Sequence, residues 1–248
     1  MEGRYNRNTL IEGFGDEGQE KLAAAKVLVI GAGGLGSPVL LYLAAAGVGT
    51  LGIADYDIVD ITNLQRQILH TTNDLGKLKI NSATLKLAAF NPGIIIQTHH
   101  KKFTDENAIS IVNDYDFIVD CSDNYTTKLL INDTCVKLQK PYSHGAVISL
   151  RGEAMTYLPG SACYRCVFDT PPEDNTLPGS SQIGVLGAVT GIIGSIQATE
   201  TIKYLIGMRE QLILNRMLII NAKDMTFVSL KVKKNTKCIC DKCISNTD

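Results

Sequence analysis

The sequence has almost no excess of charge of either sign. Among 248 residues, 24 lysines and arginines stand against 25 aspartates and glutamates, a net charge of −1. This balance gives no reason to expect a nucleic acid as the main partner, because such partners bind to basic surfaces. The hydrophobic content of 45% and the charged content of 20% are ordinary for a soluble globular chain. A chain of this length can bury a substantial core, and we expect one domain over residues 1–248.

The sequence also lacks a long uninterrupted apolar run. A membrane-spanning helix needs ~20 such residues, and the longest candidate, residues 183–207, is broken by glycines, Gln197, Glu200 and Lys203. This segment favours a buried or dimer-facing helix preceded by a loop, with a membrane span as the alternative. Residues 1–13 are polar and lack the apolar core of a signal peptide, so we expect a cytoplasmic protein.

Seven cysteines are present, and two pairs have the spacing Cys-x-x-Cys: Cys163 with Cys166, and Cys240 with Cys243. Without a secretory signal, clustered cysteines indicate a metal site or catalysis rather than disulfides. Two such pairs suit a tetrahedral Zn²⁺ site that ties the tail, residues 238–243, back onto the domain. Reduced unlinked thiols or a redox pair are the alternatives. The remaining cysteines are interpreted as packing residues or, for the last, as a spare thiol that could exchange with a ligand: Cys121, Cys135 and Cys238.

A glycine-rich turn, Gly31 to Gly36, follows an apolar strand and opens an alanine-rich helix. This context gives the G-x-G-x-x-G pattern its meaning as a phosphate-binding turn. The first glycine permits the tight turn, the second lets phosphate approach the backbone, and the third lets helix and strand pack closely. The amide groups at the helix start then face the anion. With Asp55 after the next strand as a ribose ligand, this part alone fits any NAD-dependent dehydrogenase.

Short apolar runs rich in β-branched residues alternate with helical patterns through the first two-thirds of the chain. This alternation predicts an α/β fold, a doubly wound Rossmann-like and largely parallel sheet with helices on both faces. Two further strands and the four-cysteine zinc site follow at the C-terminal end, after a long loop at about residues 169–182 that is rich in Pro, Gly, Ser and acid. The expected strands are 26–31, 50–55, 93–100, 116–122, 141–149, 152–159, 216–222 and 225–232, and the clearest helices are 75–91 and 124–139.

Polar residues gather where the predicted strands end. They are more numerous, and of other kinds, than a hydride-transfer enzyme requires. Arg66 and Lys79 are cations suited to phosphate, and Asp123 is a carboxylate suited to Mg²⁺. Taken singly, each could equally brace or cap a surface helix. Taken together in chain order, they favour a nucleoside triphosphate site at the carboxyl ends of the strands.

Several segments together resemble the ThiF/MoeB/HesA family, bacterial relatives of the ubiquitin-activating enzymes that adenylate sulfur-carrier proteins. The resemblance covers nearly the whole chain and includes the opening segment, residues 4–22. The motifs that carry it are GAGGLGSP, AD-x-D, NLQRQ, the Lys79 segment, DCSDN, CYRC and CDKC.

The resemblance implies an adenylyltransferase that joins the C-terminal glycine carboxylate of a small ubiquitin-like carrier to AMP. ATP, Mg²⁺ and Zn²⁺ would be its cofactors, the carrier would end in Gly-Gly, and thiamine or molybdopterin synthesis are candidate pathways. Arg7 would reach into the partner subunit's site, which makes a homodimer the working unit. The implied catalytic residues are Arg7, Arg66, Lys79 and Asp123, and the implied nucleotide ligands are Gly33, Gly34, Asp55, Asp57, Asn63, Arg66, Gln67, Lys79, Asp123 and Asn124.

Many family members carry a loop cysteine where this chain has Ser180. The difference favours an adenylation-only enzyme that hands carrier-AMP to a separate sulfur donor. Three alternatives remain open: an ATP-dependent relative that modifies tRNA, an NAD-dependent dehydrogenase, and a silent scaffold that binds a ubiquitin-like partner.

Overall fold

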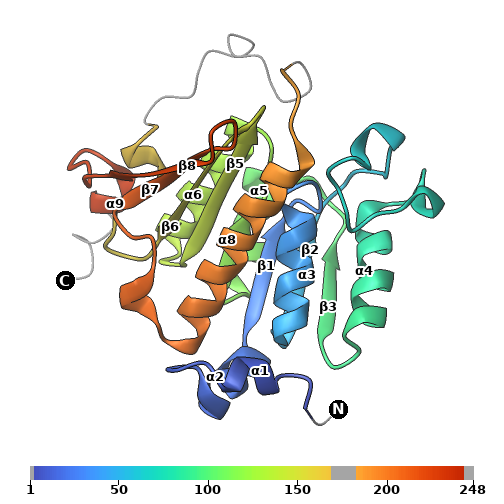
Figure 1. The fold of residues 1–248 in the computed structure, drawn as a ribbon. Coiled ribbons are helices and arrows are strands. Elements are labelled where there is room, and N and C mark those ends of the chain that lie inside the picture. The colour runs from blue at the N-terminus through green and yellow to red at the C-terminus, as the bar shows by residue number, and fades with distance from the viewer. Residues whose placement is uncertain (1–2, 169–182, 243–248) are drawn as a thin grey trace.

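A computed structural model gives the fold, and it describes residues 3–168 and 183–242. The long loop expected at 169–182, with Ser180 in it, lies outside these residues, and so does Cys243. The chain forms one eight-stranded sheet covered by helices on both faces (Figure 1).

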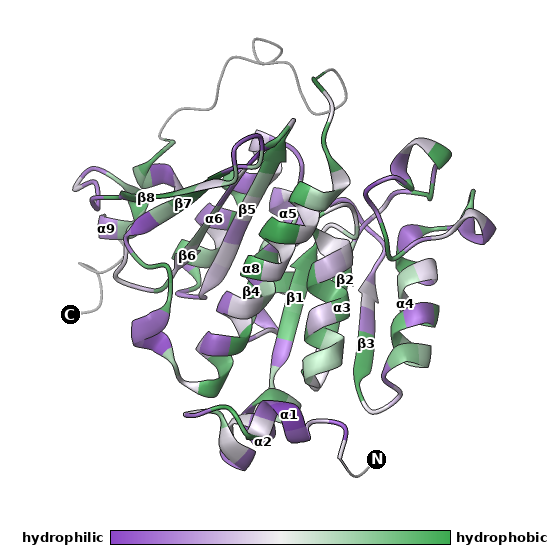
Figure 2. Ribbon diagram, in the orientation of Figure 1, coloured by the Kyte–Doolittle hydropathy of each residue, from purple (hydrophilic) through white to green (hydrophobic). Residues whose placement is uncertain are grey.

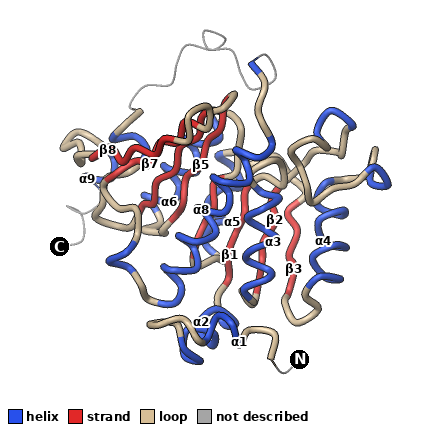
Figure 3. Tube along the Cα trace, in the orientation of Figure 1, coloured by secondary structure: helices blue, strands red, loops and turns tan. Residues whose placement is uncertain are grey.

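Five neighbouring strands of the sheet are parallel, in the order β3-β2-β1-β4-β5. Three antiparallel strands, β6, β7 and β8, extend it beyond β5. Figure 3 shows these strands fanning across the molecule. The predicted doubly wound sheet is therefore confirmed. The strands are β1 Lys26–Ile30, β2 Thr50–Ala54, β3 Ile95–His99, β4 Phe117–Asp120, β5 Tyr142–Ile148, β6 Arg151–Tyr157, β7 Arg216–Asn221 and β8 Thr226–Lys231.

Helices α3, α4 and α8 pack on one face of the sheet, while α5 and α6 cover the other (Figure 1). The α-helices are α1 Asn6–Thr9, α2 Gly15–Ala24, α3 Gly36–Ala46, α4 Lys79–Phe90, α5 Asp105–Asn113, α6 Tyr125–Lys137, α8 Gly187–Ile206 and α9 Ile239–Lys242. Short 3₁₀ turns are η1 Ile61–Asn63, η2 Thr72–Asp74, η3 Tyr164–Cys166 and η4 Arg209–Gln211.

The central strand β1 divides the core into two halves. Val27 and Val29 pack into the cluster beneath α3 and α8, while Leu28 and Ile30 pack into the cluster beneath α5 and α6. Because successive side chains of a strand point to opposite faces, a strand buried on both faces must be apolar throughout. Figure 2 shows β1 as hydrophobic beyond its hydrophilic first residue, the exposed Lys26.

The segment for which a membrane span was the alternative is the helix α8, which packs against α3, β5 and β6. Within the described ranges, no helix combines the length and the apolar character needed to cross a bilayer.

Candidate functional site

A cavity of about 770 Å³ opens at the carboxyl ends of the parallel strands, beside the point where the strand order turns outward from β1 and β4. Doubly wound sheets bind their ligands at such a switch point. The cavity extends from the glycine turn to strands β5 and β6. A cavity of this extent can hold a nucleotide and a second substrate. The predicted residues on its lining are Gly33, Gly34, Asp55, Asp57, Arg66, Gln67, Lys79, Asp123 and Asn124.

Some glycines of the turn are required for its conformation and packing, and another keeps its backbone accessible from the cavity. Gly31 has φ of +100°, a left-handed conformation that only glycine adopts easily. A Cβ on Gly36 would collide with the carbonyl oxygen of Gly31, so this glycine is required where helix α3 meets the turn. A Cβ on Gly33 would meet only the Gln67 side chain, with Nε2 at 3.5 Å. Gly33 therefore keeps the backbone open toward the cavity.

Asp55 holds the glycine turn in place. One carboxylate oxygen accepts a hydrogen bond from the amide of Ala32 at 2.7 Å, and the other accepts from the amide of Asp57 at 2.8 Å. The sequence predicted Asp55 as a ribose ligand. Its position on the cavity lining is compatible with that role, and the structure adds a bracing role that the sequence did not reveal.

Lys79 opens helix α4 with its side chain only 6% exposed. Its Nζ lies 2.9 Å from a carboxylate oxygen of Asp57, whose side chain is 50% exposed. The backbone amide of Lys79 also donates to the Asp57 carbonyl at 2.9 Å. The ammonium is thus fixed at the cavity wall by a counter-ion that water still reaches.

The segment after η1 brings Arg66 and Gln67 to the cavity, whereas Asn63, the last residue of η1, is not on the lining. Arg66 Nη1 donates to the Thr62 carbonyl at 3.0 Å, which leaves further guanidinium N–H groups for a ligand. Gln67 is buried beside Gly33, and its Oε1 has no hydrogen-bond partner. A buried polar atom without a partner costs free energy unless a ligand or water satisfies it, so this amide fits a nucleotide site.

Asp123 and Asn124 lie between the end of β4 and the start of α6. Asn124 is the N-cap of α6 and accepts from the Thr127 amide at 2.9 Å. The Asp123 carboxylate is exposed, with one oxygen 3.4 Å from the Asn124 amide nitrogen. A single carboxylate beside bound phosphates matches how proteins hold Mg²⁺, which keeps several of its waters.

Four cysteines cluster among the described residues, and Cys243 of the expected set lies outside them. Sulfurs of Cys163, Cys166, Cys238 and Cys240 all lie within 4.8 Å of one another. Zn–S bonds of ~2.3 Å in a tetrahedron place sulfurs ~3.8 Å apart, so these thiols fit zinc. Cys238, expected to be a spare thiol, is inside the cluster, 3.4 Å from the Cys163 sulfur. The tail packs on the domain as predicted, since α9 contacts α6. Cys121 and Cys135 are buried, as expected for packing residues.

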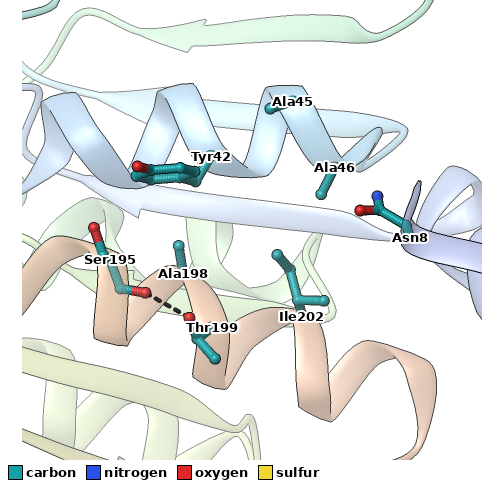
Figure 4. Close-up of a pocket in the computed structure, with 8 residues that line it drawn as sticks. All are labelled: Asn8, Tyr42, Ala45, Ala46, Ser195, Ala198, Thr199 and Ile202. Atoms are coloured by element: carbon teal, nitrogen blue, oxygen red, sulfur yellow. Dashed lines mark hydrogen bonds between the residues drawn. The ribbon is translucent and has the colours of Figure 1, made fainter. Parts of the chain in front are cut away.

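Arg7 is exposed on α1, below the sheet and away from the cavity of its own chain (Figure 1). Near it, a shallow groove separates α3 from α8, and Figure 4 shows the aromatic ring of Tyr42 above the small side chains of α8. Tyr42 is 55% exposed. The groove is lined by Asn8, Tyr42, Ala45, Ala46, Ser195, Ala198, Thr199 and Ile202.

Sequence reasoning missed a second set of polar residues on the cavity wall, among them Lys128 and Glu153. Lys128, on α6, is paired with the buried Asp120, and Glu153, on β6, contacts the buried His144. The sequence does contain a hint of this set, because a histidine and a glutamate interrupt two apolar strand patterns. Charged groups are rarely buried in a strand without partners.

The chain matches the family model described as the ThiF family over residues 5–240. It is 40% identical over 241 residues to the sulfur carrier protein adenylyltransferase of Thermus thermophilus, covering 95% of this chain and 89% of that protein. It is 44% identical over 240 residues to the adenylyltransferase and sulfurtransferase MOCS3 of Anopheles gambiae, covering 96% of this chain. The chain spans 54% of the length of that relative.

The fold is also similar to a solved structure of the E. coli protein MccB with ATP. The TM-score is 0.83 at 25% sequence identity, and the match covers 97% of this chain and 74% of the other. The family match, the relatives and the geometry of the cavity agree with the resemblance inferred from the motifs. This chain belongs to the ThiF family.

Proposed function

We propose that this chain is an ATP-dependent adenylyltransferase that activates the C-terminal glycine carboxylate of a small ubiquitin-like sulfur carrier. The observation that carries the proposal is the cavity itself, where Arg66, Lys79 and Asp123 surround the open backbone at Gly33. Cations and a metal-binding carboxylate at a glycine turn are equipment for nucleotidyl transfer. The names of the relatives from T. thermophilus and A. gambiae support the same activity.

In the proposed reaction, a carrier carboxylate oxygen attacks the α-phosphorus of ATP. A new O–P bond forms, the bond from the α-phosphorus to the bridging oxygen breaks, and pyrophosphate leaves with its electron pair. The barrier is charge repulsion between an anionic nucleophile and an anionic phosphate. Arg66 and Lys79 lower it by holding the non-bridging oxygens. Mg²⁺, held by Asp123 and the phosphates, would neutralise charge on the leaving group.

The remaining predicted ligands place the nucleotide. Amides of the glycine turn and the Gln67 Nε2–H would donate to phosphate, and Gln67 Oε1 would accept from a donor such as a ribose hydroxyl. Asp55 and Asp57 would contact the ribose and adenosine, with Asn63 and Asn124 at the edge of the site. Holding both reactants in line reduces the entropy that the transition state would otherwise require.

A homodimer completes the proposed site. The exposed position of Arg7, away from the cavity of its own chain, supports a role in the partner subunit's site. The groove between α3 and α8, with Tyr42 exposed at its rim, is a surface that a second copy could cover.

We further propose a structural Zn²⁺ in each chain, held by four of the five cysteines 163, 166, 238, 240 and 243. The geometry of the described residues favours Cys238 with Cys240 as the tail's pair. With Ser180 at the loop position where relatives carry cysteine, adenylation alone fits this chain, and a separate donor supplies sulfur. We place this single domain in the cytoplasm.

The test is ATP–pyrophosphate exchange driven by a purified carrier ending in Gly-Gly, with the same carrier lacking its last glycine as control. Exchange should require both Mg²⁺ and the intact tail. Calorimetry should detect binding of ATP with Mg²⁺ and no comparable binding of NAD. Tight NAD binding without an ATP signal would contradict the proposal.

A further inference from the structure

Four ionisable side chains form a cluster at the β5–β6 end of the cavity: Asp120, Lys128, His144 and Glu153. His144 Nδ1 lies 2.8 Å from Asp120 Oδ2, and His144 Nε2 lies 3.4 Å from Glu153 Oε1. Lys128 Nζ lies 3.2 Å from the same Asp120 oxygen. The side chains of His144 and Asp120 are 1% exposed, whereas Glu153 is 25% exposed and lines the cavity.

The surroundings of the two carboxylates determine their charge. Burial alone would raise the pKa of Asp120, but Lys128 and His144 outweigh burial and lower the pKa. Burial likewise would raise the pKa of Glu153, and the hydrogen bond with His144 lowers it. Both carboxylates are therefore ionised acceptors. A neutral imidazole has one N–H and would aim a lone pair at one of them, whereas an imidazolium donates to both.

The charges that face His144 come from three elements. Asp120 on β4 and Glu153 on β6 are negative, and Lys128 on α6 is positive, also donating to the Gly145 carbonyl at 2.7 Å. From η3, the Tyr164 ring lies 4.3 Å from the imidazole. The α8 neighbour is an uncharged amide, Gln197, which donates to the Asp120 carbonyl at 2.8 Å. With His144 protonated, the four-residue cluster is neutral.

Glu153 stands at the end of the cavity away from the nucleotide turn. In the sheet order, β6 lies three strands from β1, which at ~4.8 Å per strand is a separation of ~14 Å. A main chain that begins at the phosphates and runs across β4 and β5 would cover that separation in about four extended residues, at ~3.5 Å each. Glu153 is thus out of reach of the phosphates but within reach of a peptide tail.

We propose that His144, protonated on both ring nitrogens, is a positioning residue that holds Glu153 as the acceptor for a main-chain N–H in the last four residues of the carrier. This inference rests on the proposed function. The imidazolium contact leaves the second carboxylate oxygen of Glu153 for the tail, and its positive charge offsets the repulsion between Glu153 and the anionic terminus. A tail amide is the matching donor, because an ionised carboxylate only accepts hydrogen bonds.

The first test examines the imidazolium in the free protein, without any carrier. ¹⁵N-histidine NMR can resolve the ring nitrogens of the four histidines, and His144→Asn assigns the His144 signals. Both nitrogens should carry protons at the pH of the exchange assay. A single protonated nitrogen there would overturn the inference, whatever the function of the protein.

The second test separates tail binding from nucleotide binding. Glu153→Gln preserves shape and removes the charge, and losing a charge-assisted hydrogen bond should raise KM for the carrier by about tenfold or more. KM for ATP should not change. The matched control, Glu106→Gln on the exposed surface of α5, should behave as wild type. A Glu153→Gln enzyme with unchanged KM for the carrier would refute the tail contact.

Carriers with single N-methyl substitutions in the last four residues identify the donor. One N-methyl group should raise KM in the wild type to the Glu153→Gln value and add nothing in that variant. Additive losses would contradict a direct contact. If the wild type shows no exchange with Gly-Gly carriers, the proposed function and the tail contact both fail, while the NMR result still decides the state of His144.

Discussion

The ion pair between Lys79 and Asp57 predicts unequal losses of stability when either partner is removed. Asp57→Asn leaves an ammonium that is 6% exposed without its counter-ion, 2.9 Å from a neutral amide. At that distance two charges in an effective dielectric of ~20 attract by about 6 kcal/mol, and the half-exposed position of Asp57 weakens this. Breaking such a pair from the exposed side should cost about 3 kcal/mol in the free energy of unfolding.

Lys79→Met should have little effect on stability. It leaves the Asp57 carboxylate, half of which water already reaches, and methionine fills the space of the lysine stem. The expected cost is below about 1 kcal/mol. At roughly 2–4 °C per kcal/mol for a domain of this size, Asp57→Asn should lower Tm by about 6–12 °C and Lys79→Met by less than about 4 °C.

Calorimetry of both variants without nucleotide, followed by exchange assays, checks the reasoning. Lys79→Met should remain folded and lose exchange, because the ammonium is proposed to hold phosphate. Inorganic tripolyphosphate should stabilise Asp57→Asn more than wild type, since the phosphates supply the counter-ion that the variant lacks. If Lys79→Met is the less stable variant, or tripolyphosphate stabilises both proteins equally, Asp57 is not the counter-ion of a buried charge.

The remaining predictions concern the turn, the transition state, the dimer and the metal. Gly36→Ala should fail to fold, whereas Gly33→Ala should fold with normal Tm and bind ATP weakly by calorimetry. Equal effects on Tm would contradict a packing role for Gly36 and a ligand-access role for Gly33. Arg66→Ala should reduce carrier-driven exchange by a factor of roughly a hundred to a thousand, about 3–4 kcal/mol, at unchanged Tm, and near-normal exchange would exclude a transition-state role. Mixing Arg7→Ala with Arg66→Ala protein should restore some exchange, and no recovery after confirmed subunit exchange would refute the shared site. Elemental analysis should show zinc lost from Cys238→Ser and retained in Cys243→Ser. The reverse result would support Cys240 and Cys243 as the tail's zinc ligands, as predicted from the sequence.

Much of the nucleotide end of the site could be predicted because its residues follow strand ends in chain order. A strand that runs into glycines fixes where backbone amides lie, and parallel pairing brings the ends of β1, β2 and β4 to one edge. Knowing this edge was enough to predict that Arg66 and Lys79 lie near the glycine turn. The bracing role of Asp55 could not be predicted, because it depends on the path of the amide of Ala32 within the turn.

The other end of the cavity depends on antiparallel register, which the sequence does not specify. His144 pairs with Met155, so Glu153, two residues along β6, is the diagonal neighbour on the same face. Side chains in that relation lie close enough for a long carboxylate to reach an imidazole. A shift of one residue would turn Glu153 to the opposite face and break the contact. The set of clustered cysteines could not be predicted either, because the path of the tail after β8 decides which sulfurs lie near Cys163.

Two buried basic side chains, Lys79 and His144, each contact a carboxylate that water reaches. Lys79 is paired with a carboxylate that is 50% exposed, and His144 is paired with a glutamate that is 25% exposed. A fully buried pair would be costly to open, whereas a partner in contact with water can be rehydrated when a ligand takes its place. Phosphate could replace the Asp57 carboxylate beside Lys79, while Glu153 would keep its contact with His144 and accept the tail amide in place of water. In the proposed reaction, the folded protein would therefore keep a cation for the phosphates and an acceptor for the tail before either substrate binds. Substrate binding would then exchange existing interactions instead of bringing unpaired charges into a dry cavity, which is the preorganisation that the proposed adenylation requires.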